Sequence, residues 1–210
     1  MTTVLHPVYL PNIATFAVMA QNEICWEVSD NFQKQTYRNR SYICTDRGKL
    51  MLNIPIQHVG KNQGRQLYKE VKVDNEYNWQ RQHWRTLQTA YRTSPYFEFY
   101  EDDIAPLYNE THAHLLEYNL KSIDIICSCL QLKMPKMKTE KYELQHKTFR
   151  DMRYLVNAKK KLEFIQPPYV QVFGDRHGFI ENCSILDLLF NEGTNALSYL
   201  RNLKLAPENA

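Results

Sequence analysis

The residues best suited to chemistry lie in one short stretch, residues 30–40, which reads Asp-Asn-Phe-Gln-Lys-Gln-Thr-Tyr-Arg-Asn-Arg. It contains three cations, and no acid follows Asp30 within it. An Arg side chain is well suited to hold a carboxylate or a phosphate, because its planar guanidinium group presents a fork of donors. Two Arg residues that flank Asn39 therefore predict a loop that binds an anion. The alternative is a solvated loop rim, since runs of charge usually face water.

The spacing within this stretch suggests how it would bind. In an extended segment, alternate residues project to the same face, so Arg38 and Arg40 could approach one anion while Asn39 points away. Asp30 could orient either Arg through an ion pair, or it could simply cap a turn. We therefore expect the loop to supply three substrate-binding side chains besides Arg40, namely Lys34, Arg38 and Asn39.

The elements before this loop predict a βαβ unit. Residues 3–5 are a short β-prone run, and Asn12 can cap a helix whose apolar residues recur at spacings of three and four. The pattern of residues 24–28 then predicts a strand, which favours two parallel strands and a crossover helix. Ligands of open α/β sheets sit at the carboxyl ends of the strands, so residues 6–12 and the 30–40 loop should share one edge. We expect Tyr9 from this edge to bind the substrate.

Two histidines are candidates for catalysis. His6 ends the first strand, the position from which side chains reach ligands in α/β proteins. His83 lies on a stripe at successive spacings of four with Trp79, Leu87 and Tyr91, where a histidine is usually a core residue bonded to a carbonyl. The competing interpretation makes His83 a general base or a substrate donor at the edge of the pocket. The predicted catalytic residues are His6, Asp30 and His83.

The remaining patterns complete an α/β fold. Residues 41–45 and 50–57 predict a hairpin around the turn 46–49, with Gly48 where a positive φ is cheap. Residues 70–73 and 169–173 are further predicted strands, and residues 77–92, 96–108 and 112–132 are predicted helices. Ser184 should cap the last helices, with Asp187 three residues on in a variant of the capping box. We predict one domain, residues 1–210, with a small mixed sheet, a βαβ start and a helical second half.

Two charged segments have further possible roles. Residues 133–161 hold ten Lys or Arg against three acids. They could form a surface crossover, a flexible lid or a patch for a polyanion, and the crossover is favoured because blocks of like charge stay solvated. Residues 98–103 hold four acids, which favour a solvated face over a paired-carboxylate site.

Composition narrows the class of protein. The net charge is only +3, so steering toward nucleic acid is weak and we expect no nucleic-acid partner. No apolar run approaches the roughly 20 residues that span a bilayer, and the amino terminus has no basic leader. Five scattered cysteines are typical of reduced thiols in a cytoplasmic protein.

Metal and cofactor motifs are missing. The pairs His112/His114 and Cys127/Cys129 would point about 200° apart on a helix, so neither pair could share an ion. No GxxxxGK[ST], GxGxxG or GxSxG pattern occurs in the sequence. We therefore expect neither a metal nor a cofactor.

Several motifs together resemble the WbqC-like protein family. They are His6-Pro7-x-Tyr9-Leu10-Pro11, the stretch 33–40, Leu52-x-Ile54-Pro55-Ile56, Trp79-x-x-x-His83-Trp84, Ala90-Tyr91-Arg92-x-Ser94-Pro95-Tyr96-Phe97 and Ser184-Ile185-Leu186-Asp187-Leu188-Leu189-Phe190-Asn191-x-Gly193. Many members have Gln-Pro where this chain has His6-Pro7. The resemblance covers about residues 4–200, and it implies a bacterial protein connected with the synthesis of O-antigen or another surface polysaccharide.

Two functions from different classes are compatible with these patterns. The leading hypothesis is an enzyme of surface-polysaccharide biosynthesis that acts on an anionic small molecule such as a nucleotide-linked sugar. A transferase is the simplest form of it, because the sequence offers cations for positioning but no metal or nucleophile motif. The alternative is a non-catalytic binding or scaffold protein. A catalytic site would bring His6, Asp30, Arg40 and His83 into one cleft, whereas a scaffold would leave them dispersed or individually buried.

Overall fold

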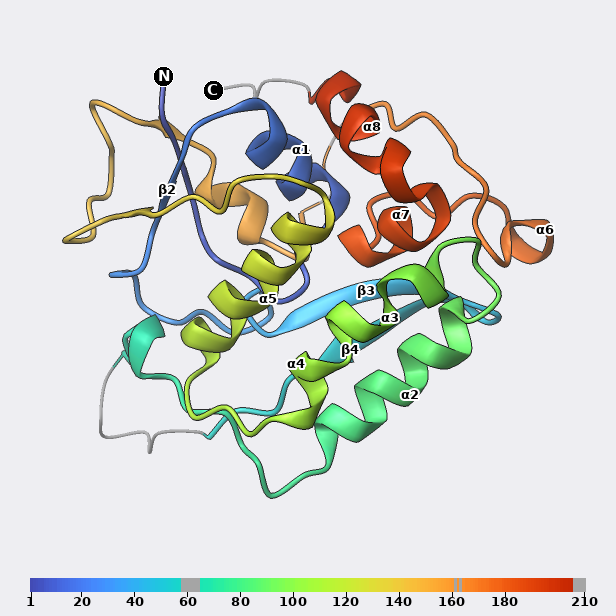
Figure 1. Cartoon of the computed structure of the whole chain (residues 1–210). Helices are drawn as coiled ribbons and strands as arrows, with labels where there is room; N and C mark the ends of the chain where they lie inside the picture. The colour runs from blue at the N-terminus through green and yellow to red at the C-terminus, as the bar shows by residue number, and fades with distance from the viewer. Residues whose placement is uncertain (58–64, 161, 163, 206–210) are drawn as a thin grey trace.

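The computed structural model describes residues 1–57, 65–160, 162 and 164–205. Its strands form a four-stranded parallel sheet, in the order β5-β2-β1-β6, and a separate antiparallel hairpin, β3-β4 (Figure 1). The strands are β1 (Thr3–Leu5), β2 (Ile24–Trp26), β3 (Arg40–Thr45), β4 (Gly48–Asn53), β5 (Met137–Lys138) and β6 (Arg150–Asp151). The predicted α/β class is confirmed, with the parallel and the antiparallel strands in two sheets.

The βαβ start is confirmed. Strands β1 and β2 pair in parallel, with Thr3 opposite Ile24, and helix α1 (Ile13–Gln21) connects them. The side chain of Asn12 caps α1, because its Oδ1 accepts a hydrogen bond of 2.9 Å from the Thr15 amide. The carboxyl ends of β1 and β2 therefore lie at the same edge of the sheet, as the sequence predicts.

The hairpin β3-β4 also follows from its sequence. Its turn includes Gly48 at a φ of +91°, a left-handed conformation that costs a glycine little. Strand β3 turns most of its side chains into the core, whereas β4 is mostly exposed. The first residue of β3 is Arg40, so the sheet register fixes the end of the cation-rich loop.

The second half of the chain is helical. The predicted helices are confirmed, although Pro106 begins a new helix within the predicted segment 96–108. The helices are α2 (Trp79–Tyr91), α3 (Phe97–Ile104), α4 (Pro106–Asn109), α5 (Leu115–Cys129), α6 (Gly174–His177), α7 (Ile185–Glu192) and α8 (Ala196–Asn202), with short 3-10 helices η2 (Tyr68–Glu70), η3 (Arg153–Val156) and η4 (Gly193–Asn195).

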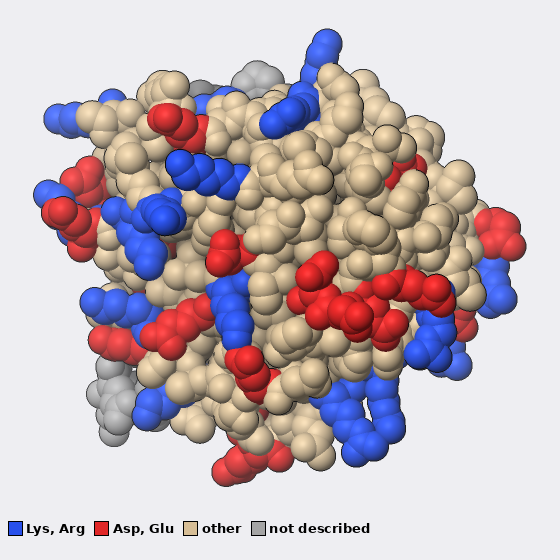
Figure 2. Space-filling view, in the orientation of Figure 1, with Lys and Arg blue, Asp and Glu red and all other residues tan. Residues whose placement is uncertain are grey.

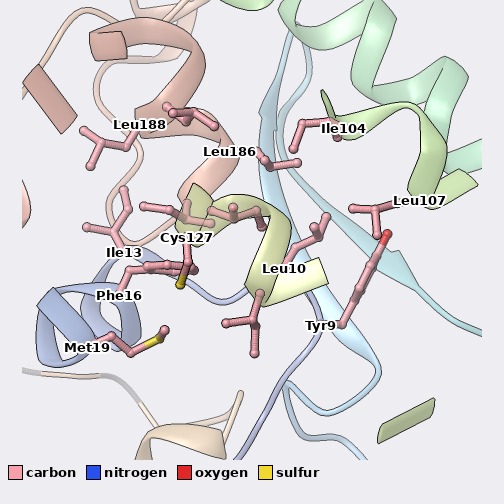
Figure 3. Close-up of a cluster of buried hydrophobic side chains, with 14 of the residues drawn as sticks. Tyr9, Leu10, Ile13, Phe16, Met19, Ile104, Leu107, Cys127, Leu186 and Leu188 are labelled. Atoms are coloured by element: carbon pink, nitrogen blue, oxygen red, sulfur yellow. The ribbon is translucent and has the colours of Figure 1, made fainter. Parts of the chain in front are cut away.

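One hydrophobic cluster joins the early and the late elements. Figure 3 shows side chains of α1, α5 and α7 gathered together, with those of Ile104 and Leu107 at one side. The residues at its centre are fully buried, as Ile13, Phe16 and Leu188 illustrate. Because α1 is covered by helices from the end of the chain, the parallel sheet depends on residues far away in sequence.

Three local predictions are wrong. Residues 70–73 form the end of η2 and two isolated bridges rather than a strand, and residues 169–173 form no ladder. The Ser184 side chain does cap α7, at 3.3 Å from the Leu186 amide, but Asp187 does not complete a capping box. Its carboxylate turns inward and accepts hydrogen bonds from Tyr91, Tyr169 and Gln171. Hydrogen bonds to distant residues therefore take the place of a capping contact at Asp187.

The basic segment completes the parallel sheet. Strand β5 pairs with β2 at one edge and β6 pairs with β1 at the other, so the described part of 133–161 crosses from edge to edge. The crossover interpretation is confirmed, and the segment also contributes Arg153, which is 8% exposed. The acids of 98–103 lie on the solvated face of α3, where Figure 2 shows a red cluster. No helix in the described ranges is both long and apolar enough to span a bilayer.

Candidate functional site

Three side chains meet at the carboxyl edge of β1 and β2. His6 follows β1 directly, and its Nε2 lies 3.4 Å from Oδ2 of Asp30 and 3.1 Å from Nη2 of Arg38. Arg38 Nη2 also donates a 2.7 Å hydrogen bond to the same Asp30 oxygen. The structure therefore assigns the ion pair of Asp30 to Arg38 rather than to Arg40.

Burial controls the protonation of this cluster. His6 is 5% exposed, and burial lowers its pKa well below 6.5, because the protonated ring would lose its hydration. The nearby cations of Arg38 and Arg153 lower the pKa further, while a hydrogen bond with the Glu27 backbone opposes them. The imidazole is therefore neutral at pH 7, and its one nitrogen lone pair accepts the hydrogen bond of the Arg38 guanidinium group.

Arg38 is held in place by its backbone and its π contact. The Arg38 carbonyl accepts a 2.6 Å hydrogen bond from Nδ2 of Asn119, which also donates to the Tyr68 hydroxyl. The Tyr68 ring lies 5.4 Å from the Arg38 guanidinium carbon, and its hydroxyl donates to the Pro7 carbonyl at 2.8 Å. These contacts fix the guanidinium group beside the sheet edge.

The guanidinium of Arg38 nevertheless has spare donors. It is fully buried, yet its Nε and Nη1 atoms have no hydrogen-bond partner among the described residues. A buried donor without a partner costs about 1–3 kcal/mol. A ligand or a water molecule that reached these atoms would recover that free energy.

A pocket of about 420 Å³ opens beside His6 and Asp30. Its other walls include Asp151, Arg153 and Tyr142, all from the basic segment. The sequence gives no periodic signal for them, because β5 and β6 are only two residues long each. We call this the His6 pocket.

Arg153 and Glu27 form a buried network behind the His6 pocket. Glu27 is fully buried, and its carboxylate accepts hydrogen bonds from the Ser29 amide and from Thr139 Oγ1, both at 2.9 Å. Arg153 Nη1 donates to Glu27 at 3.3 Å, and Arg153 Nε donates to Asp151 at 2.9 Å. The network joins β2, β6 and the residues after β5, so it braces the edge at which the site lies.

A second pocket, of about 480 Å³, lies on the other side of the 30–40 loop. The side chains of Lys34, Asn39 and Arg40 line it, with Asp74 as its one acid within the described ranges. The Nε atom of Arg40 is buried and has no hydrogen-bond partner among the described residues. We call this the Arg40 pocket, and its net positive charge suits an anionic ligand.

Local backbone structure shapes the Arg40 pocket. Asn39 Nδ2 donates to the Ile54 carbonyl at 3.0 Å and to Asn53 Oδ1 at 3.2 Å, which attaches the loop to β4. Gln35, which also lines the pocket, has a left-handed φ of +62°. Such a conformation is uncommon for a residue other than glycine, and it is often retained at functional sites.

The structure places Arg38 and Arg40, which the sequence predicts to act together, in different surroundings. The prediction that Arg38 and Arg40 approach one anion is wrong for this structure, because Arg38 is buried with His6 while Arg40 lines the other pocket. Asn39 does not point away either, since it lines the Arg40 pocket. The loop contributes to both pockets, as Gln33 lines the His6 pocket and Lys34 lines the Arg40 pocket.

His83 and Tyr9 belong to the core rather than to either pocket. The Tyr9 hydroxyl lies 2.8 Å from His83 Nδ1 and 3.2 Å from the Tyr108 hydroxyl, and the Tyr9 and His83 rings stack. Burial lowers the pKa of His83 to about 4, so this ring is neutral at pH 7. The core interpretation of His83 fits this geometry, with a tyrosine hydroxyl as its side-chain partner. The four residues expected in one cleft are thus split between the two pockets and the core.

The thiols and possible metal ligands offer no further chemistry at the site. All five cysteines are free. Burial raises the pKa of Cys44 and of Cys127 to about 12, so both are protonated at pH 7. Within the described ranges, no group of three or more His, Cys, Asp or Glu side chains could hold a metal ion.

Comparison with known proteins identifies the family to which this chain belongs. The chain is 28% identical over 196 aligned residues to the uncharacterized protein Rv1507c of Mycobacterium tuberculosis, with 81% of this chain and 84% of that protein covered. No solved structure matches the chain significantly. Residues 6–163, which include the 30–40 loop and most of both pockets, match the WbqC-like protein family. The chain therefore belongs to the WbqC-like protein family.

Proposed function

We propose that this protein is a cytoplasmic enzyme of bacterial surface-polysaccharide (O-antigen-type) biosynthesis that acts on an anionic small molecule such as a nucleotide-linked sugar. The observation that carries the proposal is the Arg40 pocket. Lys34 and Arg40 face one acid there, amide side chains surround them, and Arg40 has a buried donor without a described partner. A volume of about 480 Å³ is in the range of small-molecule sites.

A transferase is the form of reaction that we propose. In a glycosyl transfer, an acceptor hydroxyl loses its proton while its oxygen bonds to the sugar carbon. The bond from that carbon to the diphosphate breaks, and the nucleoside diphosphate leaves. His6 is the candidate base, because its imidazole is neutral at pH 7 and lines a pocket with Asp30. Asp30 would orient the ring, and the hydrogen bond from Arg38 to the ring would break as the ring accepts the proton of the acceptor hydroxyl.

A non-catalytic binding protein is the second candidate, and one observation favours it. His6 and Arg40 line pockets on opposite sides of the 30–40 loop, so the proposed base and the proposed anion site do not share one cleft. A binding or scaffold protein needs only the Arg40 pocket. An enzyme needs the His6 pocket to receive the acceptor beside the same loop.

Binding and turnover can be tested separately. UDP-glucose, GDP-mannose and dTDP-glucose would be titrated into the wild-type protein by calorimetry, with thermal shifts recorded in parallel. We expect at least one to bind, and Arg40→Lys to weaken it about ten- to a hundred-fold, because lysine keeps the charge but loses the fork. Arg81→Lys is the matched control, since Arg81 is exposed on α2 and lines neither pocket.

His6→Gln separates the two candidate functions. An enzyme should keep its affinity for the nucleotide sugar in this variant and lose the acceptor-dependent release of nucleoside diphosphate. A binding protein should show no such release even in the wild type. Failure of all three nucleotide sugars to bind, or equal weakening by Arg40→Lys and Arg81→Lys, would overturn the assignment of the Arg40 pocket.

A further inference from the structure

A third pocket lies away from the 30–40 loop, where three separate segments meet. It has a volume of about 610 Å³, and one cation comes from each segment: Arg47 from the β3-β4 turn, Arg85 from α2 and Arg176 from α6. Figure 1 shows the tip of the hairpin, the end of α2 and α6 on the same side of the molecule. We call this the three-arginine pocket.

The described lining residues leave this pocket with a net positive charge. Asp46 is the one acid among its described lining residues, so three cations and one acid leave a net charge of +2. Neither Arg47 nor Arg85 has an ion-pair or side-chain hydrogen-bond partner in the described ranges. Arg176 contacts the Phe173 ring, whose centroid lies 5.4 Å from the guanidinium carbon. Arginines from three segments line this one hollow, and the guanidinium group is the side-chain group best suited to bind phosphate oxygens.

Apolar side chains line the same hollow. Leu50, Ala90 and Phe173 contribute to its walls, and Leu50 is 41% exposed although it is a large hydrophobic residue. A pocket that combines an apolar surface with a few convergent polar groups is typical of small-molecule sites. Inorganic phosphate alone would leave this apolar surface uncovered.

The buried carboxylate of Asp187 holds the walls of the pocket together. It accepts hydrogen bonds from Tyr91 of α2 at 2.9 Å, from Gln171 at 2.8 Å and from Tyr169. The Tyr91 hydroxyl in turn accepts a hydrogen bond from the Cys44 amide of β3 at 3.2 Å. One carboxylate thus connects α2, β3 and the residues just before α6.

A further contact attaches α6 to the hairpin. Nε2 of His177 lies 2.9 Å from the Thr45 carbonyl, immediately beside the turn that carries Arg47. Arg176 is therefore placed near Arg47 by its neighbour in sequence. Together with the Asp187 hydrogen bonds, this contact fixes the positions of the three segments that carry these arginines, which are 38 or more residues apart in the chain.

We propose that the three-arginine pocket binds an organic phosphate, in which the phosphate group meets the arginines and an aromatic or aliphatic body covers Leu50 and Phe173. This site is distinct from the Arg40 pocket and does not depend on the function proposed for it. Its ligand is a phosphoester or diphosphoester.

Titration with phenyl phosphate, inorganic phosphate and pyrophosphate tests the site. The titrations would use the Arg40→Gln variant, so that the Arg40 pocket does not contribute. We expect saturable binding of phenyl phosphate that is at least about threefold tighter than that of inorganic phosphate, because burial of the ring adds to the phosphate contacts. Arg85→Gln and Arg176→Gln should each weaken it about tenfold or more.

Arg81→Gln is the matched control. Arg81 lies one turn before Arg85 on α2, is exposed, and does not line the pocket, so its replacement changes the net charge equally. Equal weakening by Arg81→Gln and Arg85→Gln would mean nonspecific attraction and would overturn the proposal, as would the absence of saturable binding. Sedimentation with phosphatidylcholine vesicles that contain phosphatidic acid distinguishes the source of the phosphate. If the ligand is a lipid headgroup, the wild-type protein sediments with the vesicles and Arg85→Gln does not. If the ligand is a soluble ester, neither protein sediments with them.

Discussion

Two buried arginines close to the His6 pocket are used in opposite ways. Arg153 is 8% exposed, and every nitrogen of its guanidinium group donates a hydrogen bond: Nε to Asp151, Nη1 to Glu27 and the Glu143 carbonyl, and Nη2 to Asp151 and the Leu144 carbonyl. Arg38 is fully buried, but only its Nη2 has hydrogen-bond partners among the described residues.

The difference separates an arginine whose donors are all satisfied from one that keeps donors without described partners. Arg153 neutralises the fully buried carboxylate of Glu27 and binds two backbone carbonyls, so its removal would leave acceptors without partners. Arg38 has two donor atoms without described partners beside a neutral histidine, which costs stability.

Arg38 and Arg153 should belong to the same cooperatively unfolding unit. We expect the chain to behave as a single domain, with a free energy of unfolding of about 5–15 kcal/mol. Tryptophan fluorescence and far-ultraviolet circular dichroism should give the same urea midpoint. A stable proteolytic fragment that ends near residue 75 would contradict the single domain, because it would contain Arg38 but not Arg153.

Replacement of Arg153 should be more destabilising than replacement of Arg38 or of Tyr142. Arg153→Met leaves Glu27 buried without its cation, and we expect a loss of about 3–5 kcal/mol in the free energy of unfolding. Lys147→Met is the matched control, because Lys147 is an exposed cation of the same segment. Urea denaturation measures both variants, and a loss below about 1 kcal/mol for Arg153→Met would show that the network is not structural.

Acid should destabilise the region around Arg38 through His6. The folded-state pKa of His6 lies well below 6.5, so its contribution to stability is complete above about pH 6.5 and is lost as the pH falls from there toward the folded pKa. Between pH 7.5 and pH 5 the loss should be about 2 kcal/mol per buried histidine.

His83 provides the comparison for this pH effect. Its pKa is lowered to about 4 in the core, away from both pockets, so it should add a loss of the same sign. His6→Gln and His83→Gln should each flatten the pH dependence measured by urea denaturation. Identical slopes for the wild type and both variants would rule out buried neutral histidines as the cause.

Removal of Arg38 should cost less than removal of Arg153. Arg38→Met breaks the ion pair with Asp30 but also removes two donors that lack described partners, and Asp30 keeps its hydrogen bond from the Asn31 amide. We expect a loss of about 1–2 kcal/mol by urea denaturation. A loss equal to that of Arg153→Met would mean that the two arginines are alike.

The smallest expected effect is at Tyr142, whose ring lies 5.1 Å from the Arg153 guanidinium carbon. Tyr142 is 42% exposed, so Tyr142→Leu should lower the free energy of unfolding by only about 0.5–1 kcal/mol. The same measurement would show a larger loss if the ring, rather than Glu27 and Asp151, holds Arg153 in place.

Much of the fold could be predicted, because local patterns specify it. The apolar spacing after Asn12, the glycine in the β3-β4 turn and the stripe along α2 each depend on neighbouring residues. The parallel pairing of β1 and β2 then follows from the βαβ order, and it correctly places His6 and Asp30 at one edge. The two-residue strands β5 and β6 are too short to show any alternation, so the basic segment could not be read as part of the sheet.

The sequence by itself determined the family, the α/β class and the stretch from which the candidate site is built. Only the tertiary structure decided which cations are paired and which are free. Arg38 meets a histidine 32 residues away and Arg153 meets a glutamate 126 residues away, and Asp187 exchanges a local cap for partners on other elements. The physical reason is that burial and ion pairing depend on which side chains the fold brings within about 3 Å, and no local pattern encodes that distance.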